Sequence, residues 1–150
     1  MSEEWMQIAA ALSGSLGFGL IFNLNHKKLY AAAIGGGVCW IAYLVFDHFL
    51  ANDYEAAFFA SAIVLVYAEI MARVLKTPVT VFSLIGTIPI IPGAALYRTM
   101  DALIQSDYEQ FGTQGIYTLL FAICMAAGIV IGTVIFKLFE KSAPVNGQAV

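Results

Sequence analysis

Long apolar runs separated by short polar connections organise this chain. Five of them reach the roughly 20 residues that a helix needs to cross a bilayer, and they cover Trp5–Leu24, Tyr30–Leu50, Tyr54–Leu75, Val79–Arg98 and Ile116–Phe139. The connections are NLNHKK, AND, KTP and a longer polar stretch from Thr99 to Gly115. The pattern predicts an all-α integral membrane protein with about five transmembrane helices.

These runs hold nearly all of the hydrophobic residues and leave no room for a separate soluble domain. We therefore expect one transmembrane domain over residues 1–141, and a disordered cytoplasmic tail over the polar residues 142–150. Only 11% of the 150 residues are charged, against about 25% in a soluble domain. The chain starts with the acidic MSEEW, whereas a secretory signal starts with a basic region, so the first run is expected to be retained.

The fourth run differs from the others because proline interrupts it. Pro89 and Pro92 stand near its middle, and Gly93 follows at once. A proline inside a helix removes a backbone donor and clashes with the preceding turn, so the helix is expected to break here. Counted from Val79, the break lies roughly 15–20 Å into a ~30 Å hydrocarbon core. Broken backbone persists at that depth only where protein or a water-filled cavity satisfies it, which makes the break a candidate functional site.

Lysine and arginine predict the orientation in the membrane. If all five segments cross, six of the seven basic residues fall on one side: Lys27, Lys28, Arg73, Lys76, Lys137 and Lys141. The positive-inside rule then puts the N-terminus outside and the C-terminus in the cytoplasm. In the alternative, Val79–Arg98 is a re-entrant hairpin, and the last two lysines lie outside. We favour five crossings.

The sequence contains no hydrolytic triad, phosphate-binding glycine loop or metal-ligand cluster, so we expect neither an enzyme nor a cofactor or metal. Transporters bind anionic groups at the N-termini of half-helices near the bilayer midplane. Pro92 suits the first position of such a half-helix, because its missing donor would be unpaired anyway. The candidate substrate-binding residues are Thr87, Pro89, Pro92, Gly93, Ala94, Tyr97 and Arg98. A proline kink that serves packing alone is the alternative.

Glu69 is the charge of greatest interest inside an apolar run. Counted from Tyr54, it lies about 22 Å along the helix, still within the hydrocarbon. A carboxylate there is costly and commonly has a partner or handles a proton. Arg73 follows four residues later, on the same helix face. A structural pair with Arg73 and a proton-coupling role for Glu69 both stay open.

Small residues predict where helices pack closely. Lipid supplies no hydrophobic drive between helices, and small side chains let their backbones approach. The second run carries Gly35, Gly36 and Gly37, and the fifth carries Gly128 and Gly132 in a GxxxG spacing. Packing within the chain is the main expectation. A partner subunit or a homo-oligomer is the alternative.

Two stretches, AEIMARVLKTPVTVF and IPIIPGAALYRTM, resemble the threonine/serine exporter family, with FGLIFNLNHKKLYAAAIGGGVCW in support. The most specific feature is the P-x-x-P-G-x-x-x-Y pattern from Pro89 to Tyr97. The resemblance implies an export permease of about ten spans with repeated halves, made as one chain or two. This chain is similar to the small split subunit that corresponds to the C-terminal membrane half. Members export threonine and serine, or dicarboxylates such as succinate, driven by the proton gradient.

We therefore predict the small subunit of a two-component exporter for a small carboxylate-bearing metabolite, in the bacterial plasma (inner) membrane. Its partners would be a larger membrane subunit of the same family, the lipid bilayer and the carboxylate substrate, with no nucleic acid. The alternative is a non-transporting scaffold subunit that stabilises a partner permease. Amino acids and dicarboxylates share the carboxylate that a half-helix would bind, so both remain open as substrates.

Overall fold

The computed structural model describes residues 2–142, and this part of the chain is helical without strands. The elements are α1 (Ser2–Ile21), α2 (His26–Leu50), α3 (Asp53–Val74), α4 (Val79–Thr87), the 3₁₀ turn η1 (Ile88–Ile90), α5 (Gly93–Ile104) and α6 (Tyr108–Ser142). The predicted all-α class is confirmed. The expected tail lies outside the described residues, apart from Ser142 at the end of α6.

Among the described residues, three helices are long and apolar enough to cross a membrane, namely α2, α3 and α6. The α4–η1 segment and α5 can form a fourth span, bent by 62° at the break. α1 is not in this set; its 20 residues include Glu3, Glu4, Gln7 and Ser13. The count of five crossings therefore stays a prediction, while a multi-pass membrane protein is well supported.

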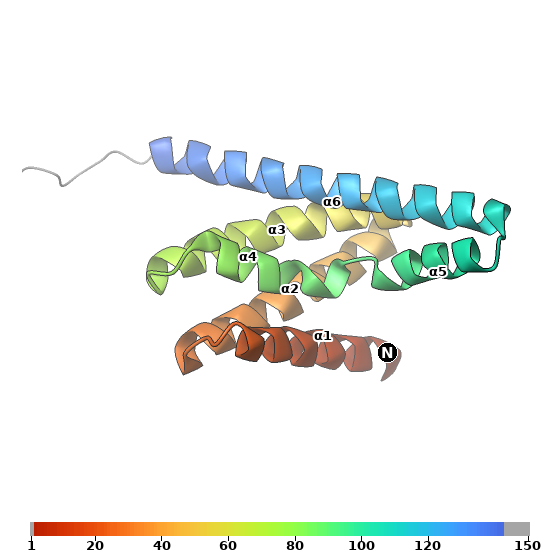
Figure 1. Ribbon diagram of the computed structural model, residues 1–150. Coiled ribbons are helices and arrows are strands. Elements are labelled where there is room, and N and C mark those ends of the chain that lie inside the picture. The colour runs from red at the N-terminus through yellow and green to blue at the C-terminus, as the bar shows by residue number, and fades with distance from the viewer. Residues whose placement is uncertain (1, 143–150) are drawn as a thin grey trace, which may run out of the picture.

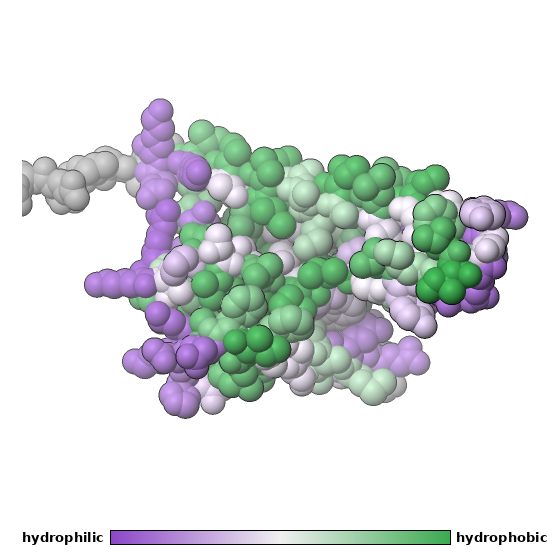
Figure 2. Space-filling model, viewed as in Figure 1, coloured by the Kyte–Doolittle hydropathy of each residue, from purple (hydrophilic) through white to green (hydrophobic). Residues whose placement is uncertain are grey.

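The chain passes back and forth along the bundle, so that the connections between helices collect at its two ends (Figure 1). The α1–α2 and α3–α4 connections and the last turns of α6 lie at one end, which we call the basic end. The start of α1 and the α2–α3 and α5–α6 turns lie at the other, which we call the acidic end. Figure 2 shows hydrophilic side chains at both ends and hydrophobic ones between them, as a membrane-spanning bundle requires.

Small side chains make the close helix contacts that were expected. A Cβ on Gly35 would meet the ring of Tyr67 on α3, whereas one on Gly36 would meet Ser15 on α1. Gly37 faces Leu12, also on α1, and so α2 packs against two neighbours through one glycine run. On α6, a Cβ on Gly128 would overlap the side chain of Ser61 and the carbonyl of Phe58, and one on Gly132 would lie 2.8 Å from the carbonyl oxygen of Ala62. These glycines therefore serve packing within the chain.

The fourth run breaks where proline predicts it, with one difference in register. α4 ends at Thr87, and three residues of 3₁₀ turn follow. Pro92, with φ −76° and ψ 57°, is the N-cap of α5 rather than its first residue. Those angles make it the centre of an inverse γ-turn, in which the Gly93 amide donates to the Ile91 carbonyl oxygen at 2.7 Å. The half-helix therefore begins at Gly93.

The stretch from Thr99 to Gly115 also differs from expectation. It was expected as a long polar connection, but α5 continues to Ile104 and α6 begins at Tyr108. Asp107 caps the start of α6, because its carboxylate accepts a hydrogen bond of 3.0 Å from the backbone amide of Gln110. The polar residues of this stretch thus lie on helices, where some of them face the break.

Candidate functional site

The helix break forms one wall of a cleft of about 480 Å³. The other walls come from α2, from the first residue of α3, and from α5 and α6. The lining residues are Trp40, Tyr43, Asp53, Pro89, Ile90, Ile91, Pro92, Gly93, Ala94, Ala95, Arg98, Thr113, Gln114, Tyr117 and Phe121. The volume falls in the range typical of small-molecule sites.

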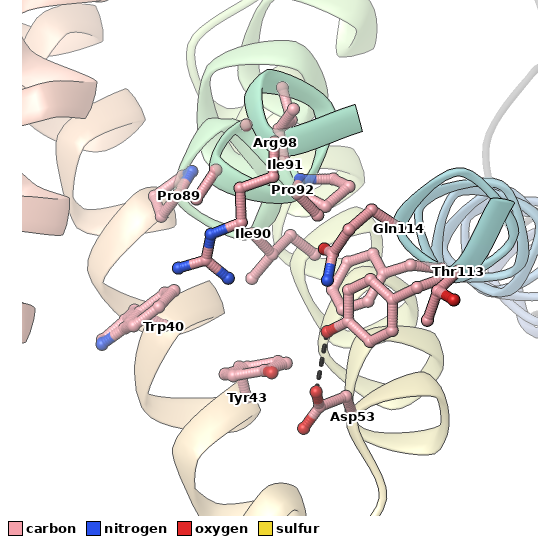
Figure 3. Close-up of a pocket in the computed structure, with 15 residues that line it drawn as sticks. Trp40, Tyr43, Asp53, Pro89, Ile90, Ile91, Pro92, Arg98, Thr113 and Gln114 are labelled. Atoms are coloured by element: carbon pink, nitrogen blue, oxygen red, sulfur yellow. Dashed lines mark hydrogen bonds between the residues drawn. The ribbon is translucent and has the colours of Figure 1, made fainter. Parts of the chain in front are cut away.

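Arg98 brings a positive charge into this cleft. It lies on the second turn of α5, and Figure 3 shows its guanidinium reaching into the cleft toward the indole of Trp40. Among the described residues, no carboxylate forms an ion pair with Arg98. A guanidinium offers several donors in a fixed fork that matches a carboxylate. Arg98 is therefore placed to bind an anionic group of a ligand.

The N-terminus of α5 adds backbone donors beside Arg98. Pro92 provides no side-chain cap, and the Gly93 amide is already bonded to Ile91. The amides of Ala94 and Ala95 have no hydrogen-bond acceptor among the described residues, and both residues line the cleft. Unpaired amides and the positive end of the helix dipole favour an anion at this position. A Cβ on Gly93 would meet nothing within 4 Å, so this approach is open.

A negative charge lines the same cleft. Asp53 is the first residue of α3, and its Oδ2 accepts a hydrogen bond of 2.7 Å from the hydroxyl of Tyr117 on α6 (Figure 3). Aromatic rings pack around this pair. The Tyr117 and Phe121 rings lie 6.0 Å apart, and Tyr43 lies 6.4 Å from Phe121. The carboxylate is thus fixed by a side chain from another helix, and it can accept from a ligand.

A comparison with known families identifies the chain. The family model described as Threonine/Serine exporter, ThrE matches residues 7–135, which include every residue that lines the cleft. The chain belongs to the threonine/serine exporter family. No solved structure matches it.

The family assignment confirms the resemblance drawn from the proline motif, and the family is one of membrane exporters. Five of the residues predicted to bind the exporter's substrate do line one cleft: Pro89, Pro92, Gly93, Ala94 and Arg98.

Two other predicted site residues lie elsewhere. Thr87 is buried, and its hydroxyl donates to the carbonyl oxygens of Ser83 and Leu84 on its own helix. Tyr97 does not line the cleft, and it is 71% exposed. Tyr97 and Arg98 are neighbours on α5 and lie about 100° apart around its axis, so Arg98 lines the cleft while Tyr97 faces outward.

Glu69 lies away from the cleft, near the basic end of α3. It is buried, and its Oε2 is 3.7 Å from the Arg73 guanidinium. Arg73 has a closer partner on α6, since it donates to Glu140 at 2.9 Å and lies 4.5 Å from the centroid of the Phe136 ring. The expected Glu69–Arg73 pair is therefore present as a long contact within a wider α3–α6 cluster.

The cleft residues that lie on α2, α3 and α6 were not predicted from the sequence. Asp53 is the last residue of the short AND connection, and Gln114 lay within the expected longer connection. The helical spacing of Thr113, Tyr117 and Phe121 was a usable signal, because these positions share one face of a helix.

Proposed function

We propose that this chain is the small subunit of a two-component exporter, and that its cleft binds a small zwitterionic amino acid of the threonine or serine type. The larger subunit would be a membrane protein of the same family. The site would work in the bacterial plasma membrane, with the N-terminus outside and the C-terminus in the cytoplasm. Threonine/serine export is the activity by which the matched family is described.

The observation that carries the proposal is the opposite charge of two residues that line one cleft. Arg98 and the amides of Ala94 and Ala95 would bind the α-carboxylate. Asp53, held by Tyr117, would accept from the α-ammonium. An amino acid carries both charges on groups bonded to one carbon, so it offers a partner to each of the two residues. Thr113 and Gln114 supply polar side chains for a small hydroxyl group.

The same arrangement disfavours a dicarboxylate. A second carboxylate on the ligand would approach Asp53, and like charges brought together in a partly dehydrated site cost several kcal/mol. Discrimination of this kind comes from the repulsive group as much as from the attractive one. Of the two substrate classes that the carboxylate alone leaves open, the cleft favours the amino acid.

Co-expression with the larger subunit tests the proposal directly. Cells preloaded with labelled threonine, serine or succinate should export the two amino acids faster than control cells, and succinate should not be exported. Asp53→Asn should lower amino-acid export about 10- to 100-fold at limiting substrate, the equivalent of one charge-assisted hydrogen bond of roughly 1.5–3 kcal/mol. Arg98→Gln should lower it similarly, because it removes the carboxylate's partner.

Glu55→Gln is the matched control, since Glu55 shares the first turn of α3 with Asp53 but does not line the cleft. It should leave export unchanged. If Asp53→Asn and Arg98→Gln alter only the abundance of the two-subunit complex, the chain is a scaffold. Succinate export that exceeds threonine export in the wild type would refute the amino-acid assignment.

A further inference from the structure

A second cavity, of about 500 Å³ and open to the surface, lies at the basic end. It is lined by the α1–α2 turn, the first residues of α2 and the end of α3: Asn25, His26, Lys27, Lys28, Val74, Leu75 and Lys76. No carboxylate is among these residues. The substrate cleft shares none of them, so the exporter site does not account for this cavity.

The three lysines concentrate positive charge that the protein leaves unneutralised. Within residues 2–142, no ion pair joins Lys27, Lys28 or Lys76 to an acidic group. The nearby acidic residues Glu69 and Glu140 are engaged with Arg73 instead. A cavity lined by several unpaired ammonium groups attracts an anion, because each group gains an opposite charge without breaking an existing pair.

The start of α2 contributes to the same preference. Its first turn contains no acidic residue, and its N-cap, Asn25, makes no side-chain hydrogen bond to the helix amides. α1, α3 and α6 have acidic residues in their first turns, whereas α4 and α5, like α2, have none. The positive end of the α2 dipole therefore adds to the charge of the lysines rather than being offset, and it too would be neutralised by an anion.

The remaining lining residues are apolar. Val74 is 67% exposed, and Leu75 stands beside it. Figure 2 shows hydrophilic side chains at the basic end directly beside hydrophobic surface. Apolar walls do not contribute to binding a free inorganic anion, whereas a phospholipid has both a charged phosphate and apolar acyl chains that can contact them. Basic pockets between helices at the cytoplasmic surface of a membrane bind anionic lipid head groups.

We propose that this cavity is a binding site for the phosphate of an anionic phospholipid such as phosphatidylglycerol. Lys27, Lys28 and Lys76 hold the phosphate, and the acyl chains follow the apolar surface past Val74. A bound lipid bridges the start of α2 and the end of α3, and so it stabilises the folded bundle. The site is independent of the substrate cleft.

The test uses the purified full chain in a neutral detergent and follows its thermal unfolding. Dihexanoyl phosphatidylglycerol should raise the unfolding midpoint in a saturable manner, whereas dihexanoyl phosphatidylcholine and inorganic phosphate should not. Lys28→Gln and Lys76→Gln should each weaken the apparent affinity about fivefold, and Lys76→Arg should retain it. Lys141→Gln is the matched control: it removes one charge at the same end but outside the cavity, and should leave the affinity unchanged.

Three results would overturn the proposal. Equal weakening by Lys141→Gln would show diffuse attraction to the basic end rather than a site. Equal stabilisation by inorganic phosphate would show a small-anion site, and equal stabilisation by phosphatidylcholine would show that the head-group charge is irrelevant. If a glutamine variant fails to fold, retained affinity in Lys76→Arg together with weakened affinity in Lys27→Gln still supports the site, and unchanged affinity in Lys27→Gln refutes it.

Discussion

Gly93→Leu is expected to lower export at least tenfold at limiting substrate while leaving membrane insertion intact. Gly93 is the first residue of α5 and lines the cleft beside the amides of Ala94 and Ala95. A Cβ built there would meet nothing within 4 Å, so a side chain can start at this position without a clash with the rest of the protein. The new isobutyl group would instead extend into the cleft. The substitution is therefore expected to impair ligand binding and not folding.

The size of the effect follows from what is displaced. Four added carbon atoms occupy roughly 100 Å³, taking each as about the volume of a water molecule. The cleft holds about 480 Å³, so volume alone would still admit a small amino acid. What is lost is the approach of its carboxylate to the helix terminus. One or two hydrogen bonds involving a charged group are worth about 1.5–3 kcal/mol each, which lowers export at limiting substrate by at least tenfold.

The measurement is efflux of labelled threonine from cells that contain both subunits, with the amount of inserted protein determined on the same membranes. Gly14→Leu is the control: Gly14 also has nothing within 4 Å of a built Cβ, but it lies on α1, outside the cleft. Gly14→Leu should export normally. Normal export by Gly93→Leu, at equal protein levels, would refute the assignment of the cleft as the substrate site.

Three further predictions concern other parts of the chain. Glu69→Gln should flatten the pH dependence of export if Glu69 couples protons, and an unchanged profile returns it to a structural role. Tyr117→Phe should raise the KM for threonine severalfold with little change in kcat, because Asp53 loses the hydroxyl that fixes it. Gly128→Ala should lower the free energy of unfolding in detergent by about 1–3 kcal/mol, since its Cβ overlaps the backbone of α3; Gly112→Ala on the same helix, with open space around it, should not.

The break, and the five residues around it that line the cleft, could be predicted because they depend on local chemistry. Pro89 and Pro92 would each disrupt the interior of a helix through their own ring and missing N–H, and Gly93 and Arg98 follow within two turns. The GxxxG spacing of Gly128 and Gly132 likewise predicted a close helix–helix contact, which these residues make with α3. Pro92 was misplaced by a single residue, because its ψ of 57° closes a γ-turn, and no sequence pattern distinguishes that turn from a first helical residue.

The opposite wall of the cleft could not be predicted, because it depends on how distant segments meet. Asp53 lines the cleft because α6 packs on α3 and places Tyr117 beside it, and the sequence alone does not show that contact. Thr113 and Gln114 were assigned to a connection because polar residues dominate that stretch. Helix propensity outweighed polarity there, and α5 and α6 extended beyond the apolar runs. Tyr97 was favoured by its place in the motif, but its position on α5 turns it outward.

The contacts between α3 and α6 limit how any proton coupling could reach the substrate. Asp53 and Glu69 lie 16 residues apart on α3, or about 24 Å along a helix, so the two carboxylates do not act on each other by contact. α6 is fixed to α3 at both places: Tyr117 donates to Asp53 at 2.7 Å, and Arg73 donates to Glu140 at 2.9 Å. Gly128 and Gly132 hold the two helices close between these points. If Glu69 takes up a proton during transport, its effect has to reach the cleft through these α3–α6 contacts, because the two carboxylates do not touch.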